Sequence, residues 1–75
     1  MMQYSYWYSF SVLTREEKIM FFEGASTGDM AVAHPFVVMA SFREKDTEGW
    51  DYTLVNFREI SLAEYNLYQE LNRKF

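Results

Sequence analysis

The sequence predicts a small α+β domain in which two helices pack on one face of a three-stranded, mainly antiparallel sheet. Three observations carry this prediction: a strictly alternating stretch at residues 4–13, a proline that opens an apolar stretch at residues 35–45, and a helix-start motif at residues 61–64. They give the chain order β-β-α-β-α. All of it forms one domain, residues 1–75, because 75 residues are about enough for a single small core.

The stretch 4–13 predicts the strand on which the sheet is built. Its even positions hold aromatic residues and Val12, whereas its odd positions hold serines, Trp7 and Leu13. Successive side chains of a strand point to opposite faces, so this strand has an aromatic face and a mostly small, polar face. Aromatic and β-branched residues suit a half-buried pleated surface.

A second strand is predicted within residues 18–23. The polar residues 14–17 separate this apolar run from the first strand, which is the pattern of a β-hairpin. Residues 24–29 then predict a loop, because two glycines enclose Ser26 and Thr27. The short apolar stretch 30–33 has no assignment.

Pro35 predicts the start of a helix over residues 35–45. Proline is favoured at the first helical position, and the preceding residue, His34, avoids helical geometry and is placed at the cap. An extended conformation of residues 36–42 is the alternative, since two valines in this stretch favour a strand.

A third strand is predicted at residues 50–57, after a turn at residues 46–49. The last element is a helix over residues 62–74. Ser61 and Glu64 fit a capping box, in which each side chain bonds the other residue's backbone N–H. Ile60 and Tyr65 stand at the positions of a hydrophobic staple, and apolar residues recur three and four apart after them.

The predicted sheet order is 2-1-3. A helix between the second and third strands makes these two strands run the same way, so placing the first strand between them makes every neighbouring pair antiparallel. Order 1-2-3, with one parallel pair, is the alternative.

Composition narrows the class of function. The net charge of −4 and a pI near 4.8 oppose binding to nucleic acid or to anionic membranes. There is no cysteine, no apolar run of membrane-spanning length and no leader pattern at the first residues, so we expect a cytoplasmic protein without a cofactor or metal.

Candidate catalytic groups lack partners in the sequence. His34 is the only histidine and is better explained as a helix cap than as a base. Ser26 and Thr27 follow a glycine, but the acidic Asp29 stands where a phosphate loop needs a lysine. The acidic residues around position 48 do not have calcium-loop spacing. We therefore expect no enzyme activity.

Trp7 suggests a binding surface. It lies among serines on the small polar face of the first strand, where a large exposed aromatic resembles an interface anchor unless a helix or the N-terminal residues cover it. We predict a non-catalytic protein-interaction module that forms a homo-oligomer or binds another protein. The alternative is a small-ligand binder with its pocket between the aromatic sheet face and the helices. The interface candidates are Trp7, Ser5, Ser9, Phe21 and Trp50.

Overall fold

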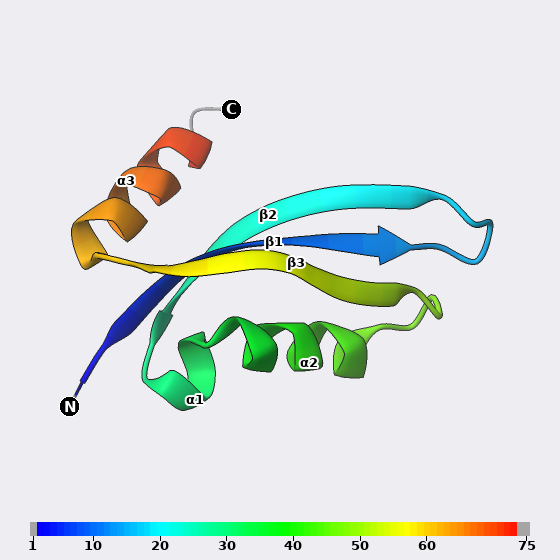
Figure 1. Cartoon of the computed structure of the whole chain (residues 1–75), viewed down its shortest axis with the longest axis horizontal. Helices are drawn as coiled ribbons and strands as arrows, with labels where there is room; N and C mark the ends of the chain where they lie inside the picture. The colour runs from blue at the N-terminus through cyan, green and yellow to red at the C-terminus, as the bar shows by residue number, and fades with distance from the viewer. Residues whose placement is uncertain (1, 74–75) are drawn as a thin grey trace.

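A three-stranded antiparallel sheet separates two helical layers of unequal size (Figure 1). The computed structural model describes residues 2–73. The strands are β1 (Tyr4–Leu13), β2 (Ile19–Gly28) and β3 (Asp51–Ile60), and their order across the sheet is β2-β1-β3. Both neighbouring pairs are antiparallel, which confirms the predicted order 2-1-3 and rejects order 1-2-3.

The turn between β1 and β2 has the hairpin form that the sequence predicts. The Thr14 backbone N–H donates to the Lys18 carbonyl at 2.9 Å, and the Lys18 N–H donates to the Thr14 hydroxyl at 3.1 Å. Glu17 closes the turn with a φ of 63°, in the left-handed region. The pairing then runs without a shift from Leu13–Ile19 to Tyr4–Gly28.

Strand β2 is longer than predicted, because residues 24–28 are paired strand and not a loop. The glycine that looked like a chain breaker makes room for a tyrosine. Gly24 lies opposite Tyr8, and a Cβ at this position would come within 2.7 Å of the Tyr8 hydroxyl oxygen. Ser26 and Thr27 lie in the strand too, where their hydroxyls donate to the carbonyls of Ala33 and Tyr4.

Two helices follow β2. The unassigned stretch forms the one-turn helix α1 (Met30–Ala33), which adds an element to the predicted order, and α2 spans Pro35–Lys45 as predicted. His34 caps α2, since its Nδ1 accepts a hydrogen bond from the Phe36 backbone N–H at 3.1 Å. The extended alternative for residues 36–42 is wrong.

The core lies between the aromatic face of β1 and α2. We call the side of the sheet that carries the even residues of β1 the tyrosine face, and the opposite side the serine face. On the tyrosine face Tyr8, Phe10 and Val12 form one buried cluster with Met39 of α2. Phe42 of α2 stacks on Phe10 with ring centroids 5.4 Å apart. This face is therefore filled by helix side chains.

Strand β3 begins one residue later than predicted and ends three residues later, at Ile60. Helix α3 (Leu62–Arg73) starts with the predicted capping box. The Ser61 N–H donates to a Glu64 carboxylate oxygen at 3.0 Å, and the Glu64 N–H donates to the Ser61 hydroxyl at 3.0 Å. Lys74, the predicted last residue of this helix, lies outside the described residues.

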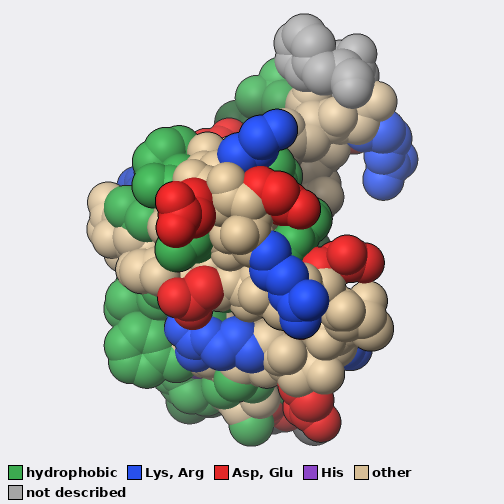
Figure 2. All heavy atoms as spheres, turned by 90° about the vertical axis from the view of Figure 1, so that its right-hand side faces the viewer, with side chains coloured by type: hydrophobic (Ala, Val, Ile, Leu, Met, Phe, Trp, Pro, Cys, Tyr) green, Lys and Arg blue, Asp and Glu red, His purple; other side chains and the backbone are tan. Residues whose placement is uncertain are grey.

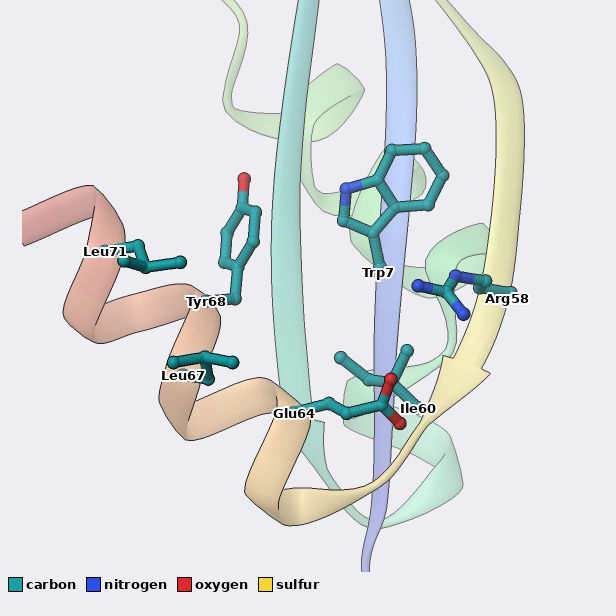
Figure 3. Close-up of a pocket in the computed structure, with 7 residues that line it drawn as sticks. All are labelled: Trp7, Arg58, Ile60, Glu64, Leu67, Tyr68 and Leu71. Atoms are coloured by element: carbon teal, nitrogen blue, oxygen red, sulfur yellow. The ribbon is translucent and has the colours of Figure 1, made fainter.

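Helix α3 lies on the serine face, which differs from the expectation that both helices share one face. It packs beside Trp7, an odd residue of β1, whereas α2 lies on the far side of the sheet (Figure 3). Two facts explain the difference. The tyrosine face is already covered by α2, and Ile60 pairs with Ser5, so the last side chain of β3 points onto the serine face.

Candidate interaction surface

Helix α3 covers only one end of the serine face. It contacts β1 and β2 near the start of β1, and it diverges from the sheet beside β2 (Figure 1). No residue of α3 is fully buried, and Leu67 and Leu71 are more than half exposed. The other end of the serine face, towards the β1–β2 turn, has no helix of the described chain on it.

Four apolar side chains occupy this uncovered end, and we call them the open patch. Leu13 and Ile19 pair across β1 and β2, and Phe21 follows two positions along β2 on the same face. Val55 lies on β3, at the irregularity that shifts the register next to Ser9. Phe21 is 75% exposed, Ile19 62% and Leu13 41%, so the patch presents large parts of its apolar side chains to solvent. The serines between them are too small to cover these groups.

A groove opens where α3 meets the sheet, and we call it the Trp7 groove. Its volume is ≈ 230 Å³. Figure 3 shows Trp7 rising from β1, two residues of β3 beside it, and the side chains of α3 opposite. The lining residues are Trp7, Arg58, Ile60, Glu64, Leu67, Tyr68 and Leu71. The walls are therefore apolar and aromatic, with two charged groups at one end.

The two charged groups of the groove differ in what they already bind. The Glu64 carboxylate accepts the Ser61 backbone bond, and this bond is the main reason why the pKa of Glu64 lies below its ordinary value. The Arg58 guanidinium adds to this lowering through its charge. Arg58 itself makes no hydrogen bond to another side chain within residues 2–73, so it is the group at this rim that is available to an anion.

The five predicted interface residues occupy different environments. Trp7 is half-buried in the groove, and Phe21 is the most exposed member of the open patch. Ser9 lies half-buried between these two sites. Ser5 is buried and shares a hydrogen bond of 3.0 Å with the Thr27 hydroxyl, whereas Trp50 packs against the core cluster on the tyrosine face. The serine face thus brings Trp7, Ser9 and Phe21 together and leaves Trp50 apart.

Several residues that the sequence offers for catalysis or cation binding are engaged in the structure of the fold. The His34 ring packs against Tyr6 and Phe57, with centroids 5.3 and 5.4 Å away, while its Nδ1 caps α2. Asp46 accepts hydrogen bonds from the Trp50 N–H at 2.9 Å and the Tyr52 hydroxyl at 3.2 Å. Within residues 2–73, no group of three or more histidine or acidic side chains is arranged to hold a metal ion.

Charge is spread thinly over the end of the molecule that carries the turns. Figure 2 looks at this end and shows acidic and basic side chains interspersed, with hydrophobic side chains gathered along one side. Nucleic-acid surfaces need basic groups clustered on one face. This view offers no such cluster.

Comparisons with protein-family models, with curated proteins and with solved structures find no match to this chain. No helix among the described residues is long and apolar enough to cross a membrane.

Sequence reasoning missed the α3 side of the groove. The spacing of Tyr65, Tyr68, Leu71 and Phe75 predicts a helix buried on one side, and the expected place for it is the face that also carries the other helix. Tyr68 and Leu71 line the groove on the serine face instead, and Phe75 lies outside the described residues. One signal could have placed this helix correctly. A single residue, Ser61, joins β3 to α3, and the side chain before it, Ile60, faces the serine side because it pairs with Ser5.

Proposed function

We propose that this protein is a non-catalytic interaction module that binds a second copy of itself through the serine face. The observation that supports it is the open patch: Leu13, Ile19 and Phe21 adjoin on the serine face, the exposed Val55 lies on β3, and no helix of residues 2–73 covers this end of the face. Contiguous exposed apolar surface of this kind usually marks an interface. The lack of cysteine is compatible with a cytoplasmic location, which we propose with it.

The size of the patch favours association between two such surfaces. Burying one large apolar side chain fully is worth about 1.5–3 kcal/mol. Association costs roughly 4–15 kcal/mol in lost freedom and ordering. A single exposed phenylalanine would not hold two molecules together, whereas the patches of two copies acting at once would give a weak to moderate dimer.

Sedimentation equilibrium over about a hundredfold range of micromolar concentration tests this proposal. We expect the mass to rise from 9.0 kDa towards twice that value. Phe21→Asp should abolish the rise and leave the far-UV circular dichroism unchanged, because Phe21 is exposed. The matched control is Val32→Asp, a similarly exposed residue of α1, and it should self-associate like the original chain. A strict monomer over the whole range would contradict the proposal.

A second candidate function is the binding of a small apolar carboxylate in the Trp7 groove. The predicted pocket between the tyrosine face and the helices is occupied by Met39 and Phe42, and the hollow lies on the other face instead. Arg58 stands at the end of an apolar channel, where it would meet the carboxylate of such a ligand.

Thermal melting with a series of medium-chain carboxylic acids tests this second candidate. Binding to the native state raises the melting temperature, and Arg58→Gln should abolish the increase. The alcohols of the same chain length are the control, since they lack the charge that Arg58 would bind. Equal effects of acids and alcohols would contradict a carboxylate site.

A further inference from the structure

The outer edges of the sheet, formed by β2 and β3, differ in whether side chains bind their outward backbone groups. An unpaired strand edge offers free N–H and C=O groups to any other strand, and proteins usually block it. On β3 the Arg43 guanidinium donates to the Tyr52 carbonyl at 2.8 Å, and the Asn56 side chain accepts from the Phe57 N–H at 2.9 Å. The register shift beside Val55 also disrupts this edge. Two outward backbone groups of β3 are therefore already bound and the edge is irregular, so pairing with another strand is disfavoured here.

The hairpin turn shows which backbone groups of β2 point outwards. Thr14 and Lys18 face each other as a hydrogen-bonded pair, because the Thr14 N–H donates to the Lys18 carbonyl. Hydrogen-bonded and non-hydrogen-bonded pairs alternate along an antiparallel ladder, and the β1–β2 register has no shift. The even residues of β2 therefore bond to β1, while Ile19, Phe21 and Glu23 point their N–H and C=O groups to the free edge.

The opposite edge confirms this alternation. The even residues of β1 bond to β2, so its odd residues bond to β3. Tyr52 and Phe57 lie opposite even residues of β1, and their backbone N–H and C=O groups therefore point away from the sheet, on either side of the register shift. These two residues are the ones whose backbone groups are bound by Arg43 and Asn56. No comparable bond reaches the outward groups of Ile19, Phe21 and Glu23 from residues 2–73.

Helix α3 limits the length of free edge on β2. Ala25 pairs with Trp7, and Figure 3 shows α3 beside β2 at this level and beyond. The part of the edge that another strand can reach is therefore Ile19–Glu23. These five residues are apolar except for the last, and their centre is Phe21.

We propose that two copies of this chain pair antiparallel along this edge, about a two-fold axis at Phe21, and join their sheets into one of six strands. This inference rests on the proposed self-association and places the contact at the β2 edge of the open patch, so that the two patches adjoin on one face of the joined sheet and do not stack on each other. Phe21 faces Phe21 of the second copy, and Ile19 faces Glu23 of the second copy. All three residues present outward groups, so each of these pairs exchanges two backbone hydrogen bonds.

A second copy suits this edge better than an unrelated strand because the segment is self-complementary. In a two-fold symmetric antiparallel contact, residues that lie opposite each other must be on the same face of the sheet. A two-fold axis at Phe21 meets this requirement, because it pairs odd residues with odd residues and even residues with even ones. The two exposed Phe21 rings then lie side by side on the serine face, and the half-exposed Phe22 meets Met20 of the second copy on the other face. Glu23 faces Ile19, so no two like charges meet although the chain is acidic.

Glu23→Pro is the variant that tests the edge. Proline removes an outward N–H, so it blocks pairing with a second copy but breaks no bond to β1. It also leaves the open patch intact, since Glu23 is not part of it. The matched control is Glu23→Thr, which removes the same side chain and keeps the N–H.

We expect Glu23→Pro to weaken self-association at least tenfold in sedimentation equilibrium, while Glu23→Thr associates like the original chain. Equal association of both variants and the original chain would overturn edge pairing and leave the proposed self-association standing. A monomeric original chain would overturn both.

Amide hydrogen exchange of the original chain gives a second measurement that does not depend on the folding of the proline variant. The amides of Ile19, Phe21 and Glu23 should exchange fast in dilute solution and at least tenfold more slowly at dimer concentrations. The amides of Met20 and Phe22 bond to β1 and should stay protected throughout. Fast exchange of the three odd amides at dimer concentrations would overturn the proposal.

Discussion

The two faces of the sheet differ in how far their apolar side chains are covered. On the tyrosine face, α2 covers the aromatic row, and Met39 and Val12 are both only 1% exposed. On the serine face, α3 covers one end with no fully buried residue of its own, and Phe21 stays 75% exposed. The difference shows that one face is packed into the core, whereas the other leaves large apolar side chains exposed.

The largest effect expected from this comparison is on Met39. Met39→Ala leaves a cavity in the core cluster and should lower the free energy of unfolding by about 2–5 kcal/mol. Phe21→Ala removes a larger side chain from the other face and should change the free energy of unfolding by no more than about 0.5 kcal/mol. Urea unfolding at a concentration where the chain is monomeric measures both. Similar losses for the two variants would contradict the division between the faces.

A medium effect on stability is expected at Gly24, the residue of β2 that lies opposite Tyr8. Gly24→Ala places a Cβ within 2.7 Å of the Tyr8 hydroxyl oxygen, and the crowding should cost about 1–3 kcal/mol in the free energy of unfolding. Glu23→Ala, the neighbouring position on the other face, should stay within about 0.5 kcal/mol. Thermal unfolding compares the two. An unchanged free energy of unfolding for Gly24→Ala would mean that the Tyr8 side chain does not need the space beside the Gly24 Cα.

The smallest effect concerns pH and the end of α2. Desolvation acts to raise the pKa of the Asp46 carboxyl, but hydrogen bonds, first of all from the Trp50 N–H, outweigh it and hold this pKa below the ordinary 3.8. A lowered native pKa gives stability that is complete above the unfolded value and is lost as the pH falls through the native value. The free energy of unfolding should therefore fall as the pH is lowered below 3.8.

Asp46→Asn separates this contribution from the titration of the other carboxyl groups. The variant should be less stable than the original chain at pH 7, and the two should converge at acid pH. Urea unfolding from pH 7 to 2.5 measures the difference. A constant difference over this range would show that the charge of Asp46 contributes nothing.

Local patterns in the sequence predicted most of the elements. The alternation in residues 4–13 gave β1 with the bounds that the structure shows, and the Ser61–Glu64 box gave the start of α3. Residues 24–28 could not be assigned this way, because two glycines mark a loop unless a neighbouring strand needs their space. That need comes from Tyr8, which is sixteen positions away in the chain.

The surface was less predictable than the fold. The sequence placed Trp7 and Phe21 among the interface candidates, and the structure puts both on the serine face. The sequence does not distinguish the buried Ser5 from Ser9, which is only half-buried. It also does not indicate that Trp50 packs against the core cluster and away from the other candidates. Exposure depends on which helix covers which face, and this is a property of the packed molecule.

The sequence by itself determined the α+β class, the sheet order and the helix starts, because alternation, proline geometry and capping act between residues close in the chain. Only the tertiary structure decided the face on which α3 lies, the strand character of residues 24–28 and the contrast between the two sheet edges. These depend on competition for space: α2 fills the tyrosine face, and α3 takes part of the other face. Arg43 and Asn56 bind backbone groups at the edge of β3, whereas no side chain of residues 2–73 binds those at the Ile19–Glu23 edge.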